Sequence, residues 1–563
     1  MINNLRFFLF SYLIVACSAS IIGAEHVIKI PLCNEDATAQ IANALKEAES
    51  KNGETTVIEF EKGDYHISRQ QATKRVYRMS NTASETENFD PTKHIGIFLN
   101  KLKNITIRGN GARIVTHGEM TQLVIDSCSN IEISGLTFTS ADPSVTEILI
   151  KSKDDASVTF EVLPMSNFLI RNGVFSFVGE GWSFGDAESG RHAVAQVYHP
   201  ESNITKRCRV SPVENYKSVE QVGPNMVRME YEKVPNVVPG DIYQLRHWIR
   251  NEVGGFINLS RDITIREVTF NFLGNFALLS QYSENLTMEK VSCIPDEEDG
   301  RTNAGFADFF HFSGCKGLIK VRDCVFIGAQ DDGINVHGTH LKIVEKLNPT
   351  KLKVRFMHPQ TFGFQPFFVD DEIEIVNSVT LNSIMPAIIK GVETINEYEY
   401  VLELDKPLPN NLDINADLVV ENVTWTPEVE ITGNYFARIP TRGILLTTRR
   451  KSIIENNTFF RLPMAAILVA DDASSWYESG PVRDLSIKNN VFIDCSVPNI
   501  LIQPEIREFD KPVHANILIE GNRFFTNGKD VISISGSENV VVRDNRIEPL
   551  GGSSVLFGSP AIE

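Results

Sequence analysis

A short phrase that recurs along the chain constrains its fold more than any other feature. It reads roughly as Asn or Asp, an apolar residue, Ile, a Gly or Asn turn, and Phe, as in NITIRGNGA from Asn104 and NILIEGNRF from Asn516. The residue five positions after the central apolar one is usually Phe. Outside two long gaps, the central apolar residues lie 23 to 33 residues apart: Ile107, Ile133, Ile265, Met288, Val321, Ile431, Ile454, Ile487, Ile519 and Val542.

This periodicity predicts an all-β fold, a right-handed parallel β-helix in which each coil of 23 or more residues supplies short strands separated by turns. The strands alternate apolar and polar residues, as a sheet with one buried face requires. Asn, Gly and Asp at the ends of the phrases suit turns, because they tolerate left-handed backbone conformations. A helical solenoid is the alternative, and the short, β-branched runs broken by Gly and Asn argue against it.

The two gaps in the repeat read as small inserted β-barrel-like domains, because both show strand-like alternation and share a turn-then-strand phrase. The repeat-like segment NFLIRNGVF, from Asn167, is assigned to the first insertion on grounds of spacing. The predicted organisation is an N-terminal cap with the first coils (25–140), the first insertion (141–247), central coils with an acidic stretch (248–341), the second insertion (342–427) and C-terminal coils (428–563).

Residues 1–24 have the pattern of a signal peptide, with Arg6 before an apolar run at 7–16 that is too short to span a membrane. Cys17 follows Ile-Val-Ala in a sequence that resembles a bacterial lipobox, so membrane anchoring through a lipidated Cys17 is one expectation. Cleavage near Ala24 is the other. Both predict an exported protein, in the periplasm or as a lipoprotein of the outer membrane or cell surface.

Composition narrows the classes of partner. The net charge is −18 without a block of like charges, which argues against a nucleic-acid partner. The eight cysteines contain no CxxC pair and no metal-ligand spacing, so buried free thiols are favoured, while a disulfide stays open in an exported protein. A homodimer is possible, since β-helices offer long exposed faces.

Chemistry is expected where three acids fall between residues 306 and 340. Asp308 begins one apolar run, and the pair Asp331 and Asp332 begins the next, one repeat later. Counted from the central repeat residues, Asn275, Asp308 and one member of the pair occupy nearly one place on successive coils. Parallel strands stand about 4.8 Å apart, so the acids should cluster, and like charges that close raise the pKa of at least one.

For any single Asp in this stretch, the simpler interpretation is that its side chain caps a strand at a turn. Calcium ligation is a further alternative. The run lacks the regular Gly-Asp repeats of calcium-binding β-rolls, so we expect no metal and no cofactor. Glycoside hydrolysis needs two acidic roles, and inverting enzymes place the two groups about 6.5–9.5 Å apart, which acids one or two coils apart can meet. Candidate sugar-binding residues nearby are His311, Asn335, His337 and Arg442.

The segments DFFHFSGCKG and GAQDDGINVHGTHL resemble the α-1,3-galactosidases of glycoside hydrolase family 110. The repeats and the two insertions match that family's layout over nearly the whole chain. The resemblance implies an exo-acting, inverting, metal-independent enzyme that removes terminal α-1,3-linked galactose from blood-group-B-type or linear α-galactosyl oligosaccharides and glycoconjugates. By motif position, Asp331 resembles the general acid, and Asp308 and Asp332 resemble the pair that activates water.

Two other hypotheses stay open at this point. A polygalacturonase-like hydrolase or a lyase would use the same fold, but would want Lys or Arg beside the acids to bind uronates, and few occur in this stretch before Arg442. A glycan-binding adhesin would keep aromatic platforms, for which Trp182, Trp248, Trp425 and Trp476 are available, and would not need stacked acids.

Overall fold

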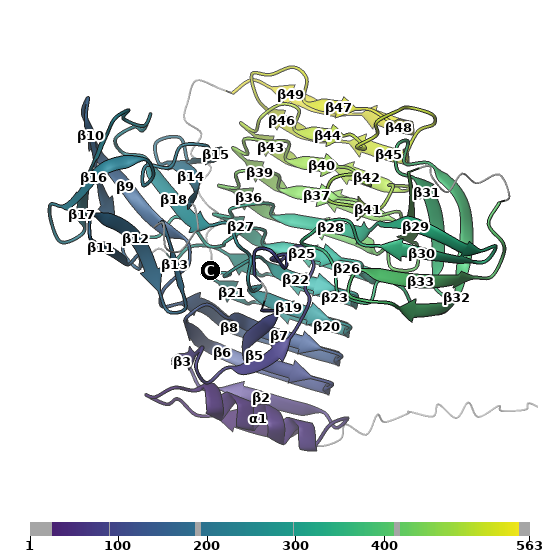
Figure 1. Cartoon of the computed structure of the whole chain (residues 1–563), viewed down its shortest axis with the longest axis horizontal. Helices are drawn as coiled ribbons and strands as arrows, with labels where there is room; N and C mark the ends of the chain where they lie inside the picture. Colours follow the sequence, from purple (N-terminus) through teal and green to yellow (C-terminus); the bar gives the residue numbers. More distant parts are fainter. Residues whose placement is uncertain (1–24, 89, 186–192, 297, 410–416, 551–563) are drawn as a thin grey trace, which may run out of the picture.

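The protein is a parallel β-helix with two inserted β domains, so the fold class predicted from the repeat is confirmed (Figure 1). The computed structural model describes residues 25–550 except 89, 186–192, 297 and 410–416. The expected signal peptide and Cys17 lie outside the described residues. One helix, α1 (Thr38–Ser50), buries Ile41, Leu45 and Ala48 against the first coil. No helix in the described part of the chain is long and apolar enough to cross a membrane.

Each coil contributes strands to three parallel ladders. One ladder runs from β2 (Thr56–Phe60) to β48 (Ser537–Arg543), and a second from β3 (Asp64–Ser68) to β49 (Arg546–Glu548). The third ladder carries the candidate site. In order, its strands are β5 (Thr92–Asn100), β7 (Thr121–Asp126), β19 (Gly255–Asn258), β22 (Leu278–Gln281), β25 (Phe310–Ser313), β28 (Ile334–Thr339), β37 (Ile444–Leu446), β40 (Ile467–Val469), β44 (Ile500–Ile502) and β47 (Ile532–Ile534).

Identical side chains stack from coil to coil inside the helix, which explains the recurring phrase. The rings of Phe326, Phe436, Phe459, Phe492 and Phe524 form one column with centroids 4.7–5.0 Å apart. Asn434, Asn457, Asn490, Asn522 and Asn545 form another, in which each side-chain amide donates to the next side-chain carbonyl at 2.9–3.0 Å. The columns bury apolar area and satisfy the polar groups of the turns.

The insertions leave this stacking undisturbed. Leu123 pairs with Gly255 and Val321 pairs with Ile431, so strands on either side of each insertion lie on adjacent coils. The first insertion is an antiparallel sheet that includes β9 (Thr146–Lys153), β14 (Ala193–His199), β15 (Ile204–Cys208) and β18 (Ile242–His247). Beside it, the segment from Asn167 forms a hairpin of β11 (Phe168–Arg171) and β12 (Val174–Gly179).

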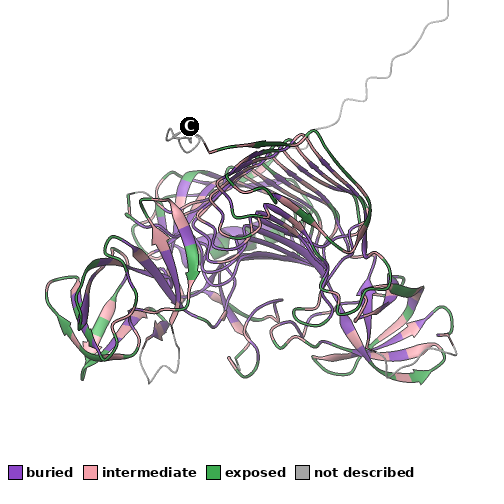
Figure 2. Ribbon diagram, turned by 90° about the horizontal axis from the view of Figure 1, so that it is seen from above, coloured by how far each residue is buried: buried purple, intermediate pink, exposed green. Residues whose placement is uncertain are grey.

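The second insertion is a closed barrel. Its strands are β29 (Leu341–Asn348), β30 (Lys351–Arg355), β33 (Glu399–Leu404), β32 (Ser383–Thr394), β31 (Glu372–Asn377) and β34 (Leu418–Asn422). The two insertions flank the β-helix on its two sides (Figure 2), and the labelled strands of the third ladder lie between them in Figure 1. Each cysteine that the structure describes is a free thiol, and most are buried, as expected from the sequence.

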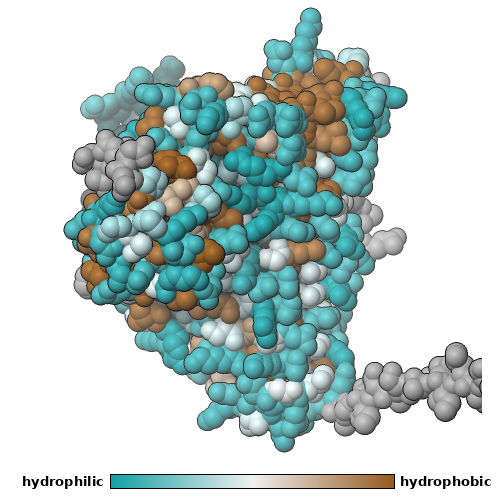
Figure 3. Space-filling model, turned by 90° about the vertical axis from the view of Figure 1, so that its right-hand side faces the viewer, coloured by the Kyte–Doolittle hydropathy of each residue, from teal (hydrophilic) through white to brown (hydrophobic). Residues whose placement is uncertain are grey.

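The last coil ends the β-helix with its apolar side chains uncovered by the described chain. Val542 and Ile547 are 48% and 51% exposed, whereas Ile519 and Phe524, one coil earlier, are fully buried. Apolar atoms gather at this end of the molecule in Figure 3.

Candidate active site

The strand register brings Asp308, Asp332 and Arg442 into line on three successive coils. Phe310 of β25 pairs with Ile334 of β28, which pairs with Ile444 of β37, and the aligned residues lie two positions before each. The carbonyl of Asp332 accepts the backbone N–H of Phe309 at 3.0 Å. The register therefore decides a question that counting left open: Asp332, not Asp331, lies over Asp308.

Counting placed Asn275 in the same line, and the structure shows that this was wrong by one residue. Leu278 pairs with Phe310, so Phe276 lies below Asp308. The repeat phrase lies in a neighbouring ladder, where a bulge adds one residue to the offset between these two coils. The third ladder lacks this extra residue, so a count taken from the repeat phrase is one residue too long there. Asn275 lines a separate hollow beside Trp182.

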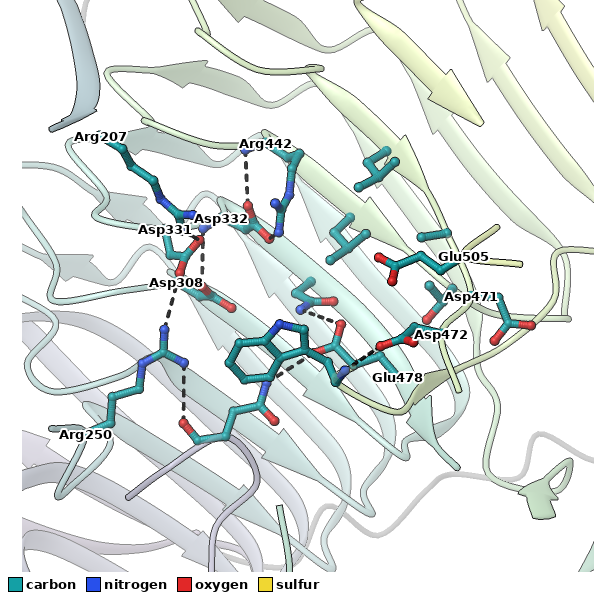
Figure 4. Close-up of a pocket in the computed structure, with 17 residues that line it drawn as sticks. Arg207, Arg250, Asp308, Asp331, Asp332, Arg442, Asp471, Asp472, Glu478 and Glu505 are labelled. Carbon is teal, nitrogen blue, oxygen red and sulfur yellow. Dashed lines mark hydrogen bonds and ion pairs between the residues drawn. The ribbon is translucent and has the colours of Figure 1, made fainter. Parts of the chain in front are cut away.

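Asp331 is held as a carboxylate by two arginines from outside the coil (Figure 4). Arg207 of β15 donates to its Oδ1 at 2.7 Å, and Arg250, which follows β18, donates to its Oδ2 at 3.3 Å. Burial raises the pKa of Asp331, but Arg207, Arg250 and Arg442 outweigh it and bring the pKa below its usual value.

Asp332 has one strong cationic partner. The backbone N–H of Arg442 donates to its Oδ1 at 3.1 Å, and the guanidinium Nη2 donates to its Oδ2 at 2.5 Å. The carboxyl is 2% exposed. Burial raises the pKa of Asp332 to about 7, because desolvation and the neighbouring Asp331 outweigh Arg442.

Asp308 contacts a histidine instead of a cation. Its Oδ2 lies 2.8 Å from Nδ1 of His311, and its Oδ1 accepts the backbone N–H of Asp332 at 3.2 Å. Burial, with the negative charge of Asp331, raises the pKa of Asp308 to about 8. The three acids, with oxygens within 4.8 Å of one another, thus include one ionised group and two that hold protons readily. Such a division of pKa values is typical of acid–base sites.

The cavity in front of the acids holds about 210 Å³ and has a second wall of opposite character. This wall carries the acids Asp471, Asp472, Glu478 and Glu505, which face the arginines across the cavity in Figure 4. Burial raises the pKa of Asp471 well above its usual value and also raises that of Glu505, whereas the pKa of Glu478 lies below its usual value. Carboxyl groups accept hydrogen bonds in either form, and the protonated form also donates, so both walls can bind sugar hydroxyl groups. An anionic sugar would meet repulsion from the carboxylate of Glu478 on this wall.

Trp476 stands at the rim of this cavity. Asp472 accepts backbone N–H groups of the four residues 474–477, which fixes the loop that carries the indole. The ring of His358, from the second insertion, stacks on the indole with centroids 4.2 Å apart. The indole is 40% exposed and lines the cavity, so it can pack against the apolar face of a sugar ring.

The predicted sugar-binding residues divide into two groups. Asn335 and Arg442 line the cavity. His311 and His337 are 0% and 1% exposed, are joined through their Nε2 atoms at 2.7 Å, and are not among the residues that line the cavity, so the structure gives them no surface for the direct contact with sugar that was expected. His311 pairs with Asn335, and His337 lies two residues after Asn335, so all three side chains lie on the outer face of the ladder. The two rings are covered there by Phe276, whose ring centroid is 4.9 Å from that of His311, and by Glu478, 3.6 Å from His337.

Sequence reasoning missed the cations beside Asp331. The expectation that few basic residues lie near the acids is wrong. Arg207, from the first insertion, and Arg250, just after the last strand of that insertion, both pair with Asp331. Glu478 was also missed. No local motif marks these residues, because folding of the insertions is what brings them to the site. Of the four tryptophans, Trp476 alone is among the residues described as lining this cavity.

Two groups of described residues bring metal-binding donors together, the three aspartates and the set His311, His337 and Glu478. The aspartates already face three guanidinium groups, which compete with a cation. Two nitrogens on one tetrahedral zinc lie about 3.3 Å apart, given Zn–N bonds of about 2.0 Å. The 2.7 Å between the two Nε2 atoms is instead a hydrogen-bond distance. Neither arrangement fits a metal as it stands.

Comparison with known proteins finds one matching family and several similar proteins that carry closely related names. A family described as "GLAA-B beta-barrel domain II" matches residues 351–419, within the second insertion. A protein named alpha-1,3-galactosidase A from Bacteroides thetaiotaomicron is 44% identical over 91% of this chain and 89% of its own length. One of the same name from Bacteroides fragilis is 35% identical over 95% of this chain and 88% of its own. A protein named alpha-1,3-galactosidase B from B. thetaiotaomicron is 31% identical over 90% of this chain and 84% of its own.

Proposed function

The chain belongs to the α-1,3-galactosidases of glycoside hydrolase family 110, and we propose that it removes terminal α-1,3-linked galactose from blood-group-B-type or linear α-galactosyl glycans. The observation that supports this most is the cluster of Asp308, Asp331 and Asp332 at the floor of the cavity. A cavity of about 210 Å³ suits one terminal sugar better than a length of polymer, which favours exo action.

In the proposed mechanism Asp331 protonates the leaving oxygen, while Asp308 and Asp332 activate the attacking water. Asp331 is ionised in the free protein, so it must gain a proton when sugar binds. Arg207 is the contact that sugar can displace, because its side chain is 55% exposed. Displacing that charge and excluding water both raise the pKa of Asp331. Arg442 opposes the rise that burial causes in the pKa of Asp332, so this acid can lose its proton near pH 7 and act as a base.

One observation favours a second mechanism for the same reaction. The nearest carboxylate oxygens lie within 4.8 Å, whereas inverting enzymes separate their two groups by about 6.5–9.5 Å and retaining ones by about 5–5.5 Å. In the retaining alternative the ionised Asp331 attacks the anomeric carbon. The two mechanisms release opposite anomers, so product stereochemistry separates them.

The test is product analysis with purified protein. α-Galactosyl-1,3-galactose, with and without a fucose branch on the acceptor, should release galactose, and proton NMR should show the β anomer first. The α anomer first would overturn inversion, and no release from either compound would overturn the assigned substrate. D308N, D331N and D332N should each lower turnover by about a hundredfold or more, as expected when a general acid or base is lost. Unchanged activity in all three would remove this site.

For the alternative of a uronate-specific enzyme, one observation speaks in favour and two speak against. Arg207, Arg250 and Arg442 could bind a carboxylate, but Asp331 and Asp332 already pair with them. The opposite wall is acidic. We therefore keep neutral galactosides as the proposed substrate. An unsaturated product absorbing in the ultraviolet from polygalacturonate would reverse that choice.

Export, lipidation at Cys17 and a homodimer remain proposals. Fractionation of cells and labelling with a fatty acid, compared between the natural chain and C17A, test the first two. The uncovered apolar end around Val542 and Ile547 supports a dimer between two copies. Light scattering should then give twice the chain mass, and V542D should give the monomer.

A further inference from the structure

A line of buried groups runs from the acid cluster along the outer face of the third ladder to Glu478. Asp308 Oδ2 lies 2.8 Å from His311 Nδ1, and His311 Nε2 lies 2.7 Å from His337 Nε2. His337 Nδ1 lies 2.6 Å from the carbonyl oxygen of Gly338, and its Nε2 lies 3.6 Å from Glu478 Oε1. All four side chains are at most 12% exposed. The strand pairing of β25 with β28 holds the two histidines on adjacent coils.

The partners of these atoms fix where protons sit. A carbonyl oxygen only accepts, so His337 Nδ1 must carry a hydrogen and donate to Gly338. One hydrogen then lies between the two Nε2 atoms, and one lies between His311 Nδ1 and Asp308. With both histidines neutral, His311 donates through Nε2 and accepts through Nδ1, so Asp308 must be the protonated acid.

The same number of protons also fits a second arrangement. The hydrogen on Asp308 Oδ2 moves to His311 Nδ1, and the hydrogen on His311 Nε2 moves to His337 Nε2. Asp308 becomes a carboxylate, His311 stays neutral as its other tautomer, and His337 becomes an imidazolium ion 3.6 Å from Glu478. No proton enters or leaves, and every hydrogen bond is kept.

We propose that Asp308, His311, His337 and Glu478 form a buried proton relay that moves a proton from Asp308 to His337 and so frees Asp308 to act on the attacking water. The inference rests on the proposed role of Asp308. His311 and His337 act through Asp308 and are positioning residues, which is consistent with their burial away from the cavity. Glu478 connects the relay to the cavity wall, because it lines the cavity and also accepts from Asn81 at 3.1 Å.

The charges around the relay favour both end states. Asp308 faces Asp331, Glu478, Arg250 and Arg442, and burial makes its acid form the stable one in the free protein. His311 faces His337, Glu478, Arg250 and Asp331, and burial lowers its pKa well below the usual value. His311 therefore passes the proton on instead of keeping it. Burial raises the pKa of Glu478, but the two histidines, the hydrogen bond from Asn81 and the charge of Arg442 together bring it below its usual value, so this carboxylate can stabilise a cation on His337.

The H337Q variant tests the relay. A glutamine carbonyl can accept from His311, but an amide cannot take up the proton, so Asp308 stays protonated until bulk pH removes its proton near pH 8. We expect the acid limb of the kcat/KM profile to move toward pH 8, with a loss of about 100-fold at pH 6 and little loss at pH 9, given tenfold per pH unit. E478Q should move the limb in the same direction by less.

A structural role alone would lower activity equally at all pH values, and a profile for H337Q that superimposes on that of the natural protein after scaling would overturn the relay. Nitrogen NMR of histidine-labelled protein gives an independent reading: His337 should carry hydrogens on both ring nitrogens when a galactose-like inhibitor binds, and a singly protonated His337 in every state would also overturn it. Failure of the proposed function is distinguishable, because the natural protein itself would then release no galactose.

Discussion

Replacing Arg442 with methionine should move the acid limb of the activity profile to higher pH. Arg442 donates to both oxygens of Asp332, through its backbone N–H at 3.1 Å and its Nη2 at 2.5 Å. Burial raises the pKa of Asp332 to about 7, and Arg442 is the main influence that opposes this rise. Methionine keeps an apolar stem of similar length and leaves the backbone donor in place, so the change removes little besides the charge.

The size of the shift follows from the geometry. An opposite charge within about 4–6 Å lowers a carboxyl pKa by about 1–3 units, so its loss raises the pKa of Asp332 by that amount. A general base works only when ionised, and the ionised fraction below the pKa falls tenfold per unit. We therefore expect kcat/KM at pH 6 to fall about 10- to 1,000-fold relative to the natural protein, and this loss to shrink as the pH rises.

The assay is release of galactose from α-galactosyl-1,3-galactose between pH 4.5 and 9.5, with the melting temperature of each variant measured at the same pH values. R442K is the matched control, because lysine keeps the charge while losing the second donor of the guanidinium, and its limb should move by less. An R442M profile reduced by one factor at every pH would refute the reasoning, since Asp332 would then not be the base whose charge Arg442 sustains.

Three further predictions follow from single contacts. R207M should raise the pKa of Asp331 and move the alkaline limb to higher pH, because a general acid fails as pH rises through its pKa; an unmoved limb would exclude Asp331 as the acid. W476A should raise KM about 5- to 100-fold, by about 1–3 kcal/mol, with the fold intact by circular dichroism, whereas W476F should recover part of the loss. N457A should lower the free energy of unfolding in urea by about 3 kcal/mol or more, because it orphans buried partners on both sides, and N545A, at the half-exposed end of the column, should cost less; equal costs would contradict the column's energetic role.

The sequence determines the coil stack well because its signal is local and repeated. A Phe five residues after each central apolar residue packs on the Phe of the next coil, as in the column through Phe436 and Phe459. Each repeat therefore predicts the same strand position and the same contact with its neighbour. The same regularity places Asp308 one coil from Asp331 and Asp332. The approximate position of the acid cluster was therefore predictable before any coordinates.

Register and charge were less predictable, for two physical reasons. A single bulged residue between two coils misplaced Asn275 by one position, and a shift of one turns a side chain to the opposite face. The protonation of the acids depends on Arg207 and Arg250, which are separated from Asp331 by 124 and 81 residues. Spacing along the chain carries no information about contacts that exist only after an insertion has folded back.

The three aspartates lie at the same edge of the β-helix, yet their pKa values differ because their partners differ. Asp308, Asp331 and Asp332 are all at most 15% exposed and lie within a few residues of equivalent positions, so the repeat alone would raise the pKa of each of them. Their partners differ. Asp308 contacts a buried histidine of its own coil, Asp332 a cation from the next coil, and Asp331 a cation from the first insertion. Because Arg207 belongs to that insertion, the domain sets the charge of the proposed acid as well as forming a wall of the cleft. An insertion displaced from the β-helix would leave Asp331 with a higher pKa even if every coil stayed in place, so the inserted domain and the catalytic coils must act as one unit.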